Sequence, residues 1–190
     1  MSPTVDTYER CPAELELILN RHLPYSLPLL RRIQFDEHKA EEPNSRVVFV
    51  SNTDSEAGTV MFTAAHVDLA GATLVVYSTL EDTGEVTDLY KHQVTALVRE
   101  INRIVADHGG ADKYPRGLVL GTLNTHIRII LLDMGNRITP RATGFYDKWL
   151  FMESEIPDIS EHLPAGMSWS TATIEDCHLV VSRTHIPRTA

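Results

Sequence analysis

The chain has 190 residues, 43% of them hydrophobic, and carries 17 basic against 26 acidic residues, a formal net charge of -9. These values are typical of one globular domain that buries roughly 70% of its unfolded surface and needs no disulfide or metal to fold. The acidic balance, with no basic run longer than the Arg31–Arg32 pair, excludes nucleic acid and anionic membrane as expected partners.

Features that would indicate export, membrane insertion or metal binding are also missing from the sequence. The N-terminal residues are polar where a signal peptide is apolar, and no stretch approaches the roughly 20 apolar residues of a membrane span. Cys11 and Cys177 lie far apart, so we expect free thiols in a reducing compartment. The nine histidines show no paired spacing, and we expect no metal site. A cytoplasmic protein is the prediction.

The first predicted elements are helices. Residues 1–11 read as a loose tail, after which Pro12 opens a short helix that ends before Pro24. Ser26 is predicted to cap a second helix, which extends past Ile33 with apolar residues at helical spacing.

Three segments rich in β-branched and aromatic residues are predicted strands, at residues 46–51, 60–69 and 73–80. Only a short connection around Ala70 and Gly71 separates the last two strands. This spacing predicts an antiparallel hairpin.

The clearest predicted helix covers residues 87–108, because its apolar side chains recur at helical spacing and form one continuous stripe. Thr87 is its predicted N-cap. Residues 117–121 then predict a buried strand, and residues 124–134 a helix. A further strand is predicted at residues 145–152.

The pattern changes after that strand to a connector, a short strand around Trp169 and a helical turn over residues 174–181. We therefore expect an N-terminal tail and short helix (1–22), an α/β domain (23–156) and a connector with a C-terminal segment packing on the domain (157–190). The order of the elements predicts an α/β sandwich, with helices flanking a mixed, largely antiparallel sheet.

The predicted hairpin holds the most suggestive group of polar side chains. With the turn at Ala70 and Gly71, His66, Asp68 and Tyr77 share one face of the sheet. A histidine oriented by a carboxylate can transfer protons near neutral pH, and a tyrosine can donate to a developing oxyanion. The alternative is a solvated sheet face or a satisfied polar pair.

Other candidate residues lie further along the chain. His126 falls in the first turn of a predicted helix, where a neutral imidazole could act beside a bound carboxylate; many such residues simply face water. Tyr146 and Lys148 share a face of the predicted strand 145–152, and Lys148 could bind a carboxylate or pair with a neighbouring aspartate. Arg183 could hold an acidic ligand or anchor the C-terminal segment.

Five segments in order, Leu23–Arg32, Ala64–Asp82, Leu118–His126, Tyr146–Phe151 and Ser182–Arg188, resemble a known family. The resemblance is to the N-terminal half of the glycine N-acyltransferase-like branch of the GNAT-type acyl-CoA N-acyltransferases, in particular a fungal group. It covers most of the chain from about residue 20 onward. It implies a GNAT-like three-layer sandwich.

The resemblance also implies where acyl-CoA would bind. In that family a pyrophosphate loop of the form Q/R-x-x-G-x-G/A lies in the second half, at a helix N-terminus, because backbone N–H groups must face the phosphates. The nearest match here, Arg141–Tyr146 (RATGFY), ends in tyrosine and leads into a predicted strand. The expected acyl-CoA segment would begin after Arg188, so we expect this chain to lack the CoA-binding half.

Three functions remain open at this point. One is a stand-alone domain that binds or converts a small molecule without CoA, as an acid-base cyclase or isomerase of a biosynthetic pathway. In it His66 and Asp68 transfer the proton, and Tyr77 or His126 polarises a carbonyl. Another is a non-catalytic binding or assembly module, which either pairs with itself as a homodimer or docks to a separate partner that provides the missing half. The last is an N-acyltransferase completed by oligomerisation, the one case that would use acetyl-CoA or acyl-CoA; otherwise we expect no cofactor.

Overall fold

The computed structural model describes residues 2–37, 44–53, 60–121, 123–134, 165–168 and 170–183. The chain divides into two compact units, Met1–Tyr146 and Asp147–Ala190. The elements of the first unit are β1 (Thr4–Tyr8), α1 (Ala13–Arg21), α2 (Leu27–Glu37), β2 (Ser45–Thr53), β3 (Val60–Asp68), β4 (Thr73–Ser78), α3 (Leu80–Thr83), α4 (Asp88–Asp107), α5 (Gly110–Lys113), β5 (Val119–Gly121) and α6 (Thr125–Asp133). The described part of the second unit holds α7 (Ile174–Arg183).

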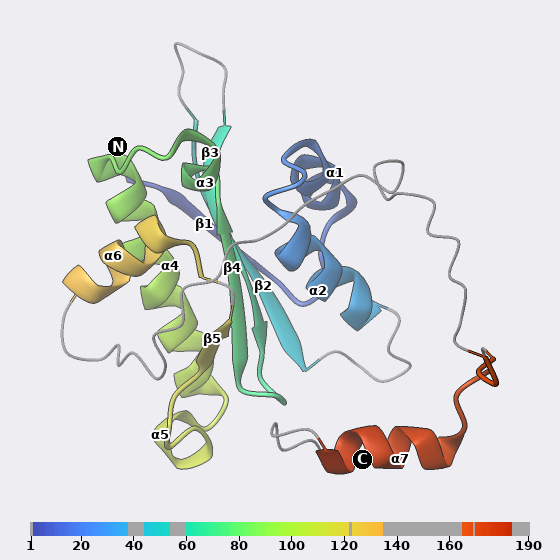
Figure 1. Ribbon diagram of the computed structural model, residues 1–190. Coiled ribbons are helices and arrows are strands. Elements are labelled where there is room, and N and C mark those ends of the chain that lie inside the picture. The colour runs from blue at the N-terminus through green and yellow to red at the C-terminus, as the bar shows by residue number, and fades with distance from the viewer. Residues whose placement is uncertain are drawn as a thin grey trace. The chain divides into compact units, whose positions relative to one another are not determined.

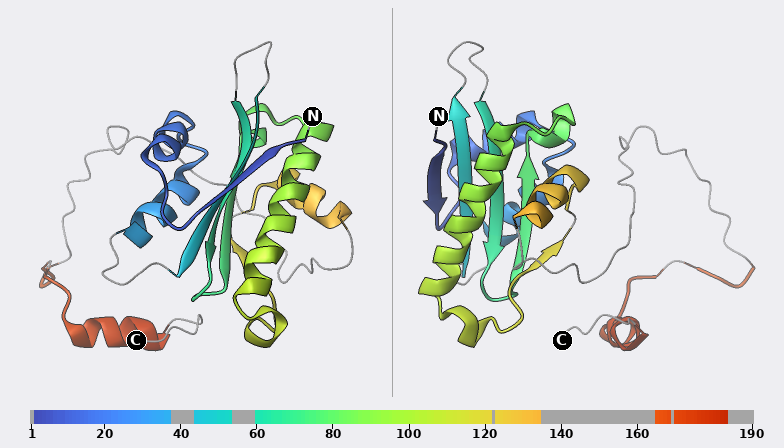
Figure 2. Two further views of the ribbon diagram at one scale, coloured as in Figure 1. Left: turned by 180° about the vertical axis from the view of Figure 1, so that it is seen from behind. Right: turned by 90° about the vertical axis from the view of Figure 1, so that its left-hand side faces the viewer.

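A five-stranded sheet in the order β1-β2-β3-β4-β5 is the centre of the first unit. Its first three pairings are antiparallel, whereas β4 and β5 run parallel. Helices α1 and α2 cover one face of the sheet, and α4 and α6 cover the other, as Figures 1 and 2 show. The structure thus confirms the predicted three-layer α/β sandwich and its mixed, largely antiparallel sheet.

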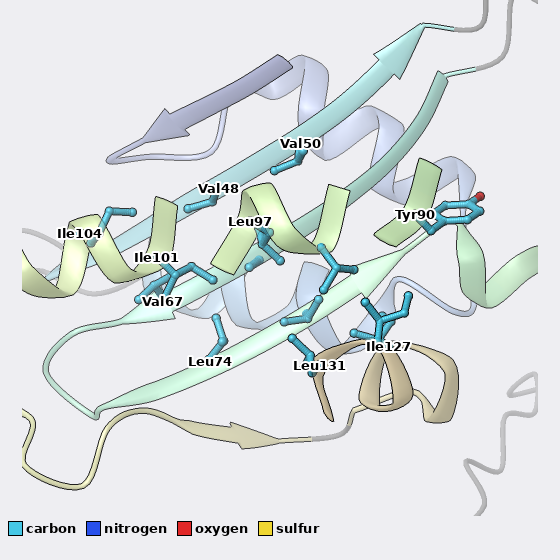
Figure 3. Packing of buried hydrophobic residues seen from close by; sticks show 14 of the residues in the cluster. Val48, Val50, Val67, Leu74, Tyr90, Leu97, Ile101, Ile104, Ile127 and Leu131 are labelled. Atoms are coloured by element: carbon cyan, nitrogen blue, oxygen red, sulfur yellow. The ribbon is translucent and has the colours of Figure 1, made fainter. Parts of the chain in front are cut away.

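Each face of the sheet has its own hydrophobic core, because successive residues of a strand point to opposite faces. On β3, Phe62 and Ala64 belong to the cluster under α1 and α2. Ala65 and Val67 belong to the cluster under α4 and α6, part of which Figure 3 shows. A residue of β3 is therefore assigned to one layer or the other by its position in the strand.

The β3–β4 hairpin has the register that the sequence predicts. His66 pairs with Val75 and Asp68 with Thr73. Asp68 also closes the turn, since its Oδ1 atom accepts hydrogen bonds from the backbone N–H groups of Ala70 and Gly71. This aspartate turn leaves His66 and Tyr77 on the face covered by α1 and α2.

Three expectations about the first unit are wrong. Residues 4–8 are not part of a loose tail but form β1, which pairs with β2 along its whole length. Ser26 precedes α2 without capping it: Pro28 has no N–H to offer, and the Ser26 hydroxyl donates to the Leu19 carbonyl at 2.6 Å. The strand β5 is not buried, because Val119 and Gly121 are exposed.

The elements predicted after residue 144 are a strand at 145–152, a short strand around Trp169 and a helix over 174–181. The predicted strand 145–152 lies outside the described residues, as does Trp169 itself. Residues 165–168 and 170–173 on either side of Trp169 form no strand. The predicted helix in this region is confirmed as α7, which Thr173 and Asp176 cap through reciprocal hydrogen bonds. Among the described helices, none is both long and apolar enough to span a membrane.

Candidate functional site

The most unusual polar contact of the sheet joins His66 on β3 to Asp36 on α2. The His66 Nε2 atom lies 2.7 Å from Asp36 Oδ2, and both side chains are buried, with 2% and 8% of their surface exposed. An ionised carboxylate only accepts hydrogen bonds, so the His66 proton lies on Nε2 and the Nε2–H donates. His66 therefore has a carboxylate partner, but it is Asp36 rather than the predicted Asp68.

Asp36 was missed because it lies 30 residues away from His66 in the sequence. One signal could have found it. Leu29, Ile33 and Asp36 follow one another at spacings of four and three residues, which places a carboxylate in the apolar stripe of α2. A charged side chain in such a stripe needs a buried partner, because an unpaired buried charge is strongly unfavourable.

Burial decides the charge state of His66. It lowers the pKa of His66 below the ordinary value of 6.5, since a buried imidazolium loses its hydration; the carboxylates of Asp36 and Asp68 oppose this shift, and Arg32 adds to it. The ring is therefore neutral at neutral pH. Its second nitrogen, Nδ1, is buried and has no hydrogen-bond partner among the described residues.

Two further polar groups lie on the same face of the hairpin as His66. The Thr73 hydroxyl, opposite Asp68, is buried and has no partner within the described part of the chain. Tyr77 is 1% exposed and packs its ring against Phe62 and His22, at centroid distances of 5.7 and 6.0 Å. The predicted sharing of one face by His66, Asp68 and Tyr77 is correct, but Tyr77 is a core aromatic residue in this arrangement.

Of the other predicted residues, His126 is not brought to this group. His126 lies in the first turn of α6, which packs on the opposite face of the sheet, and its backbone N–H donates to the Asn124 side chain at 2.8 Å. Arg183 is exposed in the last turn of α7, in the second unit. Tyr146 and Lys148 lie outside the described residues. Within the described ranges, no group of three His, Cys, Asp or Glu side chains is placed to hold a metal ion.

A second buried polar group, which the sequence analysis did not identify, fixes α4 to the sheet. The Gln93 amide accepts from the Thr63 hydroxyl at 3.0 Å and donates to Asn52 Oδ1 and to the Met61 carbonyl, each at 2.9 Å. Gln93 has no exposed surface. Its amide oxygen and nitrogen both have partners, so the network is a structural link rather than a reactive site.

The turn between β4 and α4 is acidic. Glu81, Glu85 and Asp88 lie in or beside it, and the sequence has no lysine or arginine between residues 79 and 90. A hydrogen bond from Lys91 lowers the pKa of Asp88 below its usual range, so this first residue of α4 is ionised at neutral pH. The positive end of the helix dipole therefore already faces a carboxylate.

Comparison with known proteins agrees with this fold. The family model described as the acyl-CoA N-acyltransferase verG N-terminal domain matches residues 2–149. The match covers the whole sheet and its flanking helices, and it confirms the resemblance to the N-terminal half of an acyl-CoA N-acyltransferase. Neither the comparison with curated proteins nor that with solved structures gives a match.

Proposed function

Because this chain belongs to the family of the acyl-CoA N-acyltransferase verG N-terminal domain, we propose that it is the CoA-free half of an N-acyltransferase system. In this function the unit contributes a folded surface for association and does not itself hold acyl-CoA. The single observation that carries the proposal is the acidic turn at the start of α4, defined by Glu81, Glu85 and Asp88.

The acidic turn is unfavourable for the phosphates of CoA. A helix N-terminus after a strand is favourable for a pyrophosphate because its free backbone N–H groups and the helix dipole both attract anions. Here carboxylates occupy that position, and Asp88 is already paired with the helix dipole and with Lys91 at 3.0 Å. A multiply charged phosphate group would be repelled from the site where such a fold could otherwise accept it.

Calorimetry tests this proposal directly. We expect acetyl-CoA titrated into the chain to give no saturable heat up to about 1 mM, the concentration at which a binding free energy of roughly -4 kcal/mol would be detected. Saturable heat with one site per chain would overturn the proposal. The same titration at high ionic strength is the control, since salt screens the repulsion between the acidic turn and the phosphates and would leave any other contact with CoA detectable.

Association is the second half of the proposal, and a second copy of the chain is its proposed partner. Large hydrophobic side chains are exposed along α1, the α1–α2 connection and α2: Leu17, Leu23, Tyr25 and Phe35. Exposed apolar surface of this kind favours protein contacts. In sedimentation velocity we expect a concentration-dependent dimer that Leu17→Glu weakens at least tenfold. Ile129→Glu, on the exposed side of α6, is the matched control; a chain that is monomeric at all concentrations contradicts self-association.

An acid-base cyclase or isomerase is the alternative function, and one observation favours it: the unpartnered Nδ1 atom of His66, on a ring oriented by Asp36. A substrate would have to reach a side chain that is 2% exposed. Native mass spectrometry of the purified chain tests this. A stoichiometric small molecule that is lost in His66→Gln supports the enzyme, and its absence from the wild-type chain counts against it.

A further inference from the structure

The contact between His66 and Asp36 is a buried polar link between α2 and the middle of the sheet. It joins the last turn of α2 to β3 at 2.7 Å, and both side chains are buried. Neither the association nor the absence of CoA binding proposed above uses this pair. The environment of this contact depends instead on the protonation of the His66 ring.

The charged groups that face His66 come from two elements. Asp36 and Arg32 lie on α2, and Asp68 lies on β3 itself. The cross-strand neighbours of His66 on β2 and β4 are Val47 and Val75, which carry no charge. Within the described residues, two carboxylates and one guanidinium therefore set the electrostatic environment of the imidazole.

Protonation of His66 adds a hydrogen to Nδ1, because Nε2 already carries one. That new donor lies in the core, where Nδ1 has no acceptor among the described residues. A buried donor without a partner is costly, and it is relieved when the ring reaches water. The ring reaches water if the C-terminal half of α2 separates from β3, since the contact with Asp36 on α2 is buried.

We propose that the His66–Asp36 contact is an acid-sensitive latch, which holds α2 against the sheet while His66 is neutral and releases it when His66 is protonated. The direction of the pH dependence follows from the burial of the His66 ring. The pKa of His66 is lower in the folded unit than its ordinary value of 6.5, so the closed state binds the proton less tightly than the open state. The latch is fully stabilising above pH 6.5 and weakens as the pH falls toward the lowered pKa.

Hydrogen exchange of backbone amides tests the latch in the full chain. After correction for intrinsic exchange rates, we expect the opening constant of α2 amides to rise between pH 7.5 and pH 5, by at most tenfold per pH unit. Amides of α4, which packs on the other face of the sheet, should change much less. Equal changes in α2 and α4 would mean that the whole unit opens, and no change in α2 would mean that His66 controls nothing; either result overturns the proposal.

Two substitutions and one spectrum complete the test. His66→Gln keeps a donor near the Nε2 position but cannot titrate, so α2 exchange should lose its pH dependence. His92→Gln, the same change at an exposed position of α4, should keep it. Nitrogen-15 spectra of the wild-type ring give an answer that does not depend on the variant folding. We expect a neutral Nε2–H tautomer at pH 7.5, and an imidazolium at that pH would overturn the latch.

Discussion

Asp36 and Gln93 are polar side chains in the apolar stripes of helices, and each meets a partner on the sheet. Asp36 follows Ile33 by three residues, and Gln93 follows Tyr90 by the same interval. Both are buried, and Gln93 has three hydrogen bonds of 2.9–3.0 Å. Buried polar groups of this kind specify how a helix docks, because only one placement satisfies them.

Replacing Gln93 by leucine should therefore be strongly destabilising. The change leaves the Thr63 hydroxyl and the Asn52 side chain with one fewer partner each in a buried site, at a cost of about 2–4 kcal/mol in the free energy of unfolding. Urea unfolding measures this difference. Gln34→Leu on the half-buried side of α2 is the control and should change the free energy by less than about 1 kcal/mol. Similar losses in the two variants would contradict the assigned role of Gln93.

Helix ends and strand pairs depend on a few local interactions, and the sequence reveals some of them better than others. The hairpin register was predictable because Asp68, Ala70 and Gly71 favour a tight turn, and a tight turn aligns the strands. The strand β1 was not predictable, since five residues at a polar terminus become a strand only when β2 offers its edge. The exposure of β5 likewise depends on which neighbours it meets.

The N-cap residues of α4 and α6 are Thr87 and Asn124, and substitutions at these two positions can be compared directly. The Asn124 side chain accepts a hydrogen bond from the His126 N–H, whereas Thr87 at the start of α4 makes no side-chain cap hydrogen bond. We expect Asn124→Ala to lower the free energy of unfolding by about 1 kcal/mol, and Thr87→Ala to lower it by clearly less. Thermal unfolding of both variants checks this order. A larger loss from Thr87→Ala would show that the cap geometry is not what stabilises these helix ends.

At the scale of the whole molecule, one sheet separates two cores. All residues of both buried clusters lie between Leu15 and Leu131, inside the first compact unit. Those clusters contain the apolar stripes of α1, α2, α4 and α6, so the unit has its own hydrophobic stabilisation. The described residues of α7, by contrast, are exposed, including Ile174 and Val180.

A chain ending at Tyr146 should therefore keep the fold of the first unit. We expect its thermal midpoint to stay within about 3 °C of that of the full chain, because ~1 kcal/mol corresponds to a shift of 2–4 °C at this size. Circular dichroism through the thermal transition measures the difference. Aggregation or a midpoint lowered by more than 10 °C would instead show that residues 147–190 stabilise the first unit.

The sequence by itself determined the helices, the central strands, the hairpin register and the membership of an N-acyltransferase-related family. These features follow from periodicity, turn residues and local propensity, which act over short stretches of chain. Only the tertiary structure decided that His66 meets Asp36 and not Asp68, that His126 lies on the other face of the sheet, and that Gln93 is fully satisfied. These outcomes depend on how α2, α4 and α6 pack on the sheet. That packing brings together residues 30 or more positions apart, and no local pattern encodes the pairing.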